Sequence, residues 1–445
     1  MLGLSLNLGL GASGGGGTPW EEFTAPAGFL GIWDYTSTFA IEQSGRNFRS
    51  TFDAAVYAAP AGVTVYVDPV NGASGNNGLS SGAAKDTLQN ALDITNASVV
   101  VLAPGYYDRA KTWGTSGPAL YRNTALLCPT GRAIFAMANA SYTWSKTGGR
   151  TNVYQATTNT AEIVADHTNL DSEGFPTPLV NVGSVATCDS TPNSWYHDGT
   201  VLYVHTFDAR SPGSSSSNPI VAFRNNLVGF EIEGNYEFYF KSIDLWGGRD
   251  GALFYTTTNG TAAKVIAEDC TFAYSDQGFT ADDLDFAYAR NCKAKYNKLD
   301  GFSINSATTQ TKAVFENCRG TMCGLDSFLG AGQDDFDDNC NAFTAHDSSV
   351  MIVLNGYGDK TDGPIIAQVG TSTSLILGTY AGESYATTQG AGGADVSYKV
   401  AAGTTMWMEN CESGPSYDGR QNTGTLYDLG GYIDGSQNGD DGTIS

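Results

Sequence analysis

Five copies of one short motif mark this sequence: Glu268-Asp269-Cys270, Arg290-Asn291-Cys292, Glu316-Asn317-Cys318, Asp338-Asn339-Cys340 and Glu409-Asn410-Cys411. Each copy joins a charged residue, an aspartate or asparagine, and a cysteine. The first four cysteines are separated by steps of 22, 26 and 22 positions. Repetition at such a period is typical of a solenoid, in which each repeat stacks only on its neighbours.

The segments between these triplets have the periodicity of β-strands. In residues 230–233, 264–268, 286–289 and 313–316 apolar side chains tend to alternate with polar ones. Gly, Asn, Asp and Ser separate these runs and favour turns. The pattern predicts an all-β coil of parallel strands, a β-helix. The cysteines are then expected to form an inward ladder of small apolar residues.

The composition excludes several classes of partner. The chain has 445 residues and a formal net charge of −23. This charge argues against nucleic acid, whose phosphates require Lys and Arg, and against an anionic membrane surface. Neutral sugars, basic groups and divalent cations remain. The eight cysteines do not resemble a disulfide framework, because four recur at equivalent positions.

No segment is expected to enter a membrane or to direct export. Apolar runs fall short of the roughly 20 residues of a membrane span. Residues 1–17 lack the basic start and compact apolar core of a signal peptide. We therefore expect synthesis in a cytoplasm without membrane insertion.

The two ends of the chain differ from its middle. Leucines alternate with small or polar residues over positions 2–10, and a glycine-rich tether follows up to residue 17. A lone strand is not stable, so this segment is expected either to add to a sheet in another chain or to be disordered. Residues 18–61 are rich in aromatics and predict a capping module with a helix over 47–59. Residues 416–445 predict a C-terminal tail, of which residues 434–445 are expected to be a loose end.

Residues 62–107 carry a resemblance to a known family. Residues 64–72 read as a strand, 75–80 as an Asn/Gly loop, 86–93 as a short helix with Leu88, Ala91 and Leu92 inward, and 99–102 as a strand before Pro104-Gly105-Tyr106-Tyr107. This order resembles the opening of pectate-lyase-like right-handed parallel β-helix proteins of the bacteriophage tailspike or tail-fibre type. Residues 83–85 depart from it, because the family often has a proline there.

Two later segments extend the resemblance to about residues 62–415. Residues 195–206 read as a hairpin about an Asp-Gly turn, and residues 344–356 also resemble phage β-helix proteins. The resemblance implies a homotrimer that binds host surface polysaccharide and is attached to other virion proteins through residues 1–17. Three activities stay open: a hydrolytic depolymerase, a non-catalytic adhesin or virion decoration protein, and a free polysaccharide lyase.

The candidate site residues lie on the solenoid. Adjacent coils are about 4.8 Å apart, so stacked carboxylates approach the separations of about 5–9.5 Å found in glycosidases. Aspartates before Gly or Ser are also ordinary turn residues. No cofactor is required, and Ca²⁺ is the candidate metal. The candidates are Asp276, Asp300, Asp326 and Glu316 for catalysis, Trp246, Tyr274, Tyr288, Tyr296 and Arg290 for substrate, and Asp334, Asp335 and Asp337 for metal.

Overall fold

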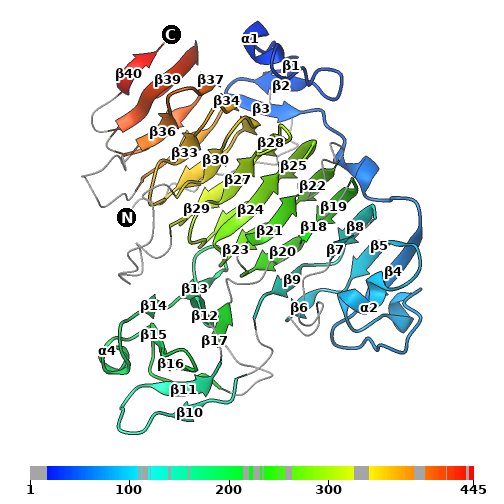
Figure 1. The fold of residues 1–445 in the computed structure, drawn as a ribbon, viewed down its shortest axis with the longest axis vertical. Helices are drawn as coiled ribbons and strands as arrows, with labels where there is room; N and C mark the ends of the chain where they lie inside the picture. The colour runs from blue at the N-terminus through cyan, green and yellow to red at the C-terminus, as the bar shows by residue number, and fades with distance from the viewer. Residues whose placement is uncertain are drawn as a thin grey trace.

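The computed structural model is a right-handed parallel β-helix with two additions, a strap at its N-terminus and an insertion on its flank (Figure 1). The structure describes residues 18–108, 112, 119–120, 122–138, 142–158, 161–213, 220–223, 231–232, 235–248, 250–255, 263–324, 340–384, 396–416, 418–436 and 440–444. The predicted fold class is confirmed. Among the described residues no helix combines the length and apolar character needed to cross a membrane. The leucine-rich segment 1–17 lies outside them.

The described strands of the solenoid form three parallel stacks, and β39 runs from the first stack into the second. Stack 1 comprises β7 (Ala119–Leu120), β18 (Glu231–Ile232), β21 (Asp250–Tyr255), β24 (Gln277–Asp282), β27 (Phe302–Asn305), β30 (Phe343–Ala345), β33 (Ile366–Gln368), β36 (Val396–Val400), β39 (Asp418–Gly430) and β40 (Asp440–Ile444). Stack 2 comprises β4 (Val63–Val67), β5 (Ala97–Leu102), β8 (Thr124–Leu127), β19 (Glu237–Lys241), β22 (Lys264–Glu268), β25 (Phe286–Arg290), β28 (Lys312–Glu316), β31 (Val350–Leu354), β34 (Thr373–Leu377) and β37 (Thr405–Glu409). Stack 3 comprises β6 (Gly105–Tyr107), β9 (Ala133–Ala136), β20 (Ile243–Trp246), β23 (Thr271–Ala273), β26 (Lys293–Lys295), β29 (Arg319–Thr321), β32 (Tyr357–Asp359), β35 (Tyr380–Ala381) and β38 (Glu412–Ser413).

The cysteine ladder lies inside the corner between stacks 2 and 3. Cys270, Cys292, Cys318 and Cys411 follow strands of stack 2 and are buried free thiols. Cys340 does not belong to this ladder, which corrects the prediction. β28 pairs with β31, so the position after Cys318 is Gly356. The chain between β29 and β30 is long, and this length moves Cys340 to the corner before β30.

The same corner holds a ladder of left-handed residues. Asp269, Asn291, Asn317 and Asn355 have φ angles of 53°, 56°, 52° and 48°, a conformation that Asn and Asp adopt more readily than other residues with a β-carbon. The amide of Asn291 donates to Asp269 (3.3 Å), that of Asn317 to Asn291 (3.4 Å) and that of Asn355 to Asn317 (2.9 Å). Each coil therefore turns at the same place.

The N-terminal region lies along the outer face of stack 2 rather than over an end of the solenoid (Figure 1). Residues 41–57, here called the strap, run from the last coils back towards the first. The backbone N–H of Phe48 donates to Asn355 (2.9 Å), and Ser50 Oγ donates to Glu316 (2.7 Å). The elements of this region are β1 (Glu21–Glu22), α1 (Ala27–Leu30), β2 (Ile41–Ser44), β3 (Asn47–Ser50) and the 3₁₀ helix η1 (Ala54–Tyr57).

The helix expected over residues 47–59 is not formed. Residues 47–50 form a strand instead, from which Phe48 and Ser50 are buried against polar and aromatic side chains of stack 2. These tertiary contacts override the local helical pattern. The strap passes close to the corner ladder at Gly378 (φ 62°). A β-carbon there would lie 2.7 Å from the carbonyl oxygen of Arg46, which explains why glycine replaces asparagine.

The two ends of the solenoid differ from each other. At the first coil, the short helix α2 (Leu88–Leu92) buries Leu88, Ala91 and Leu92 as predicted, and Thr87 caps it through the N–H of Asn90 (3.1 Å). A 3₁₀ turn, η2 (Ser81–Ala83), precedes it. At the last coil the sequence predicts a loose tail. The structure instead continues the solenoid through β39 and β40, since their backbone groups extend stack 1.

The solenoid is interrupted between β9 and β18 by an insertion, residues 142–223. Its two small sheets enclose their own apolar core. The hairpin predicted over residues 195–206 is present as β15 and β16. The elements are β10 (Ser145–Lys146), β11 (Tyr154–Thr157), β12 (Ile163–Leu170), β13 (Pro176–Pro178), β14 (Val180–Asn181), α4 (Val185–Ser190), β15 (Ser194–His197), β16 (Val201–His205) and β17 (Ile220–Phe223).

Asn355 should contribute more to stability than its ladder neighbour Asn291. Both residues hold the left-handed corner, but only Asn355 bonds both the N–H and the C=O of Phe48. We expect Asn355→Ala to lower the free energy of unfolding by about 1–3 kcal/mol more than Asn291→Ala, because buried backbone groups lose partners. Denaturant unfolding and the rate of proteolysis within residues 41–57 measure this. Equal losses in the two variants would show that the strap is not held here.

Candidate functional site

The predicted aspartate column is not formed by Asp276 and Asp300, the two of its members that the structure describes. The register pairs Asp250 with Gln277 and Phe279 with Phe302, so continuing it places Gln277 beside Asp300. Asp276 lies one residue earlier, 3.8 Å from the ammonium of Lys298. The repeat period locates a coil, but not the register to a single residue. Asp326 lies outside the described residues, as do the metal candidates Asp334, Asp335 and Asp337.

Glu316 and Tyr288 lie under the strap, which contradicts their predicted roles in catalysis and substrate binding. Glu316 is 4% exposed and accepts hydrogen bonds from Tyr288 and Ser50, both at 2.7 Å. Burial raises the pKa of Tyr288 well above its ordinary value. Arg290, the third predicted residue on this stack, bonds Glu268 through Nε (2.9 Å). These side chains attach the strap or connect coils.

Two of the three aromatics predicted on stack 3 pack the insertion against the solenoid. Tyr274 is 1% exposed, donates to the carbonyl of Pro176 (2.7 Å) and stacks on Phe223 with ring centroids 4.7 Å apart. Tyr296 is also buried and donates to Asp171 (2.8 Å). These contacts contradict a role in stacking on sugars. Trp246 is largely buried too, but it also lines a cavity.

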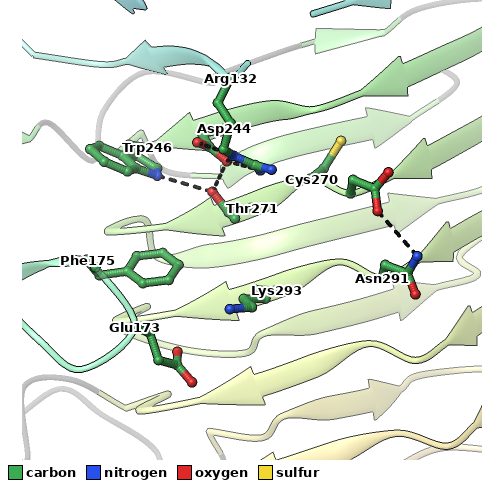
Figure 2. Close-up of a pocket in the computed structure, with 11 residues that line it drawn as sticks. Arg132, Glu173, Phe175, Asp244, Trp246, Cys270, Thr271, Asn291 and Lys293 are labelled. Carbon is green, nitrogen blue, oxygen red and sulfur yellow. Dashed lines mark hydrogen bonds and ion pairs between the residues drawn. The ribbon is translucent and has the colours of Figure 1, made fainter. Parts of the chain in front are cut away.

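The cavity lies on the outer face of stack 3, beneath a loop of the insertion, residues 171–175 (Figure 2). Its volume is about 300 Å³, the lower end of the range for small-molecule sites. Successive coils form its floor, because the register aligns Asp244, Thr271 and Lys293. We call it the roofed pocket. Its lining residues are Arg132, Glu173, Gly174, Phe175, Asp244, Trp246, Asp269, Cys270, Thr271, Asn291 and Lys293.

An ion pair fixes the floor of the roofed pocket. Asp244 is 3% exposed and accepts from Arg132, whose Nε lies 2.8 Å from one carboxylate oxygen. The hydroxyl of Thr271 also donates to Asp244, and Trp246 Nε1 donates to that hydroxyl (3.3 Å). A buried carboxylate requires such partners. Asp244 therefore holds Arg132, Thr271 and the indole in place.

A second set of ion pairs anchors the roof. Lys295 lies 2.7 Å from Asp171 and 3.1 Å from Glu173, and Arg319 lies 2.8 Å from Glu173. Burial acts to raise the pKa of Asp171, but hydrogen bonds from Lys295 and Tyr296 outweigh it and hold that pKa below its ordinary value. The loop is thus tied to two coils of stack 3, with both of its carboxylates engaged.

A separate group of titratable residues lies on or next to strands of stack 1 and comprises Asp282, Asp300 and His346. His346 Nε2 is 3.7 Å from a carboxylate oxygen of Asp300, which also accepts from the N–H of Asn341 (2.8 Å). Burial raises the pKa of Asp282, and the charge of Asp283 adds to the shift. Burial acts to lower the pKa of His346, but Asp300 and neighbouring aspartates raise it above its ordinary value. A carboxyl with a raised pKa meets one requirement of a general acid.

No metal centre is evident in the part of the chain that the structure describes, where no three His, Cys, Asp or Glu side chains group to hold an ion. The roofed pocket itself is not among the predicted sites, apart from Trp246. One signal for it is present in the sequence. The residue after each ladder cysteine, as in Thr271, Lys293 and Arg319, starts a strand of stack 3 and faces outward.

The sequence matches no protein-family model, and no curated protein is significantly similar to it. Among solved structures, the fold is similar to that of a protein described as a glycoside hydrolase, with a TM-score of 0.51 and 10% identity over 85% of this chain and 96% of that chain. Pectate lyase Pel9A has a TM-score of 0.45 and 13% identity, covering 87% and 81% of the two chains. XylC in complex with xylose has a TM-score of 0.46 and 7% identity, covering 84% and 70%. At 10% identity, the similarity to the glycoside hydrolase establishes the fold alone.

The docking of the insertion should depend on pH through Asp171. The pKa of Asp171 in the folded protein is below its ordinary value of about 4. Ionised Asp171 therefore stabilises the folded protein fully above about pH 4, and this stabilisation is lost as the pH falls through the folded pKa. Asp171→Asn should lower the thermal unfolding temperature at pH 6 and reduce its decline between pH 6 and pH 3. Calorimetry at several pH values measures both. A variant that declines as steeply as the wild type would contradict this role.

Proposed function

We propose that the protein binds a host surface polysaccharide through the roofed pocket. The observation that carries this proposal is the composition of the pocket, in which one aromatic wall faces polar side chains from successive coils. The rings of Phe175 and Trp246 have centroids 6.5 Å apart, while Thr271, Asn291 and Lys293 supply hydrogen-bonding groups. Apolar surface with a few placed polar groups is typical of small-ligand sites. A sugar ring offers the complementary apolar face and hydroxyls.

The pocket favours binding over bond cleavage. Asp244 is paired with Arg132, and Glu173 with Lys295 and Arg319. Asp269, the remaining carboxylate of the lining, accepts from the amide of Asn291 (3.3 Å). A carboxylate that acts as a general acid or base must come within hydrogen-bond reach of the substrate, and these carboxylates already have partners. The non-catalytic adhesin therefore agrees best with the geometry.

The biological setting of this proposal rests on the sequence. We propose a bacteriophage tailspike or tail-fibre component, assembled as a homotrimer and attached to the virion through residues 1–17. The resemblance of residues 62–107 and the alternating leucines support this setting. Deleting residues 1–17 should remove the protein from purified virions while leaving glycan binding intact. Virions that retain the truncated protein would contradict the attachment.

Phe175 should be needed for glycan binding. Phe175→Ala removes half of the aromatic wall, and we expect about a tenfold loss of affinity, or about 1.4 kcal/mol. Titration calorimetry with fragments of extracted host polysaccharide measures this. Phe207→Ala is the matched control, because Phe207 is an exposed aromatic of the same insertion that does not line the pocket. Equal affinities of the two variants would place the glycan elsewhere.

Hydrolysis is the second candidate function, and the raised pKa of Asp282 near the Asp300–His346 pair supports it. If Asp282 acts as general acid, Asp282→Asn should reduce depolymerisation about 10²–10⁴-fold, while preserving an acceptor for Asn305. Chromatographic sizing of the polysaccharide after incubation measures this. An unchanged polysaccharide with wild-type protein would leave the adhesin, and ultraviolet absorbance of an unsaturated uronate would instead indicate a lyase.

A further inference from the structure

Lys293 lies at the end of the pocket floor, on the coil after Thr271. The register aligns it with Thr271 on one neighbouring coil and with Arg319 on the other. These outward positions are about 4.8 Å apart along the solenoid axis. Figure 2 shows the nitrogen end of the Lys293 side chain turned towards Phe175 and Glu173 of the roof loop.

The other cations around the pocket are already paired. Arg132 pairs with Asp244, while Lys295 and Arg319 pair with Glu173, which belongs to the roof loop. The ammonium of Lys293 makes no hydrogen bond or ion pair with any residue that the structure describes. The chain has 46 acidic and 23 basic residues, so carboxylates are plentiful, yet none of the described ones meets this lysine. An ammonium at the base of a partly enclosed pocket is a site for an anion.

We propose that the roofed pocket takes a sugar residue bearing an anionic substituent, a uronate carboxylate or a sulfate ester, with this group at Lys293 Nζ. The proposal rests on the glycan-binding function above and specifies its ligand. The rings of Phe175 and Trp246 contact the sugar, and the Lys293 ammonium supplies the counter-charge that the protein leaves open. The net charge of −23 opposes a polyanion at long range, so recognition depends on this short-range contact.

Titration calorimetry with matched ligands tests the proposal. The probes are uronate-containing oligosaccharides, their neutral forms in which the carboxyl groups are reduced, and sulfated derivatives of those neutral forms. Wild-type protein should bind at least one anionic form about tenfold more tightly than the neutral form, and salt should reduce the difference. The form that is preferred, uronate or sulfate, identifies the anionic group.

Variants assign the preference to Lys293. Lys293→Gln should remove the preference by weakening the anionic ligand about tenfold while leaving neutral binding within twofold, and Lys293→Arg should retain it. Lys312→Gln, on β28 of stack 2, is the control and should behave as wild type. Circular dichroism and thermal unfolding confirm that the variants fold.

The failures are distinguishable. Equal binding of the anionic and neutral forms by wild type, or an equal loss of both in Lys293→Gln, overturns the anionic assignment and leaves glycan binding in place. If wild type binds none of the oligosaccharides, the proposed function fails and the inference fails with it.

Discussion

The two-residue corner between stacks 2 and 3 is the constraint on which the rest of the structure depends. In most coils a left-handed aspartate, asparagine or glycine turns the chain and a small buried residue follows it, whereas left-handed Ser242 and buried Ile243 take these places in the coil that carries Asp244. Because this corner keeps one geometry, the outward residue after it falls at the same height in each coil. Thr271, Lys293 and Arg319 are aligned for that reason. The pocket floor is thus a consequence of the corner.

The faces of the solenoid have different uses because different segments cover them. The strap occupies the outer face of stack 2, where Glu316 and Tyr288 are buried. The insertion packs against Tyr274 and Tyr296 of stack 3 and encloses a small volume beneath its loop. Changes in coil length fall outside the corner, as in the long connection between β29 and β30. The solenoid can therefore carry additions without losing its register.

The fold could be predicted from sequence further than the site could. A motif that recurs along the solenoid indicates directly that the coils stack. The sequence of helix α2 has an apolar pattern that predicts which of its side chains are buried. The floor of the pocket follows the recurring cysteine motif, but the roof and the strap depend on long-range contacts that no local pattern encodes. Phe48 reaches Asn355, and Glu173 reaches Arg319, across large separations in sequence. The aspartate prediction failed because the one-residue difference between Asp276 and Gln277 decides which side chain lies beside Asp300.

In the proposed function, the roofed pocket holds one unit of a polysaccharide while the polymer continues outside the pocket. The most direct test is a crystal structure with a bound fragment of the host polysaccharide. The account predicts a sugar ring beneath residues 171–175, against Phe175 and within hydrogen-bonding distance of Lys293. An empty pocket with sugar bound beside Asp300 and His346 on stack 1 would contradict it.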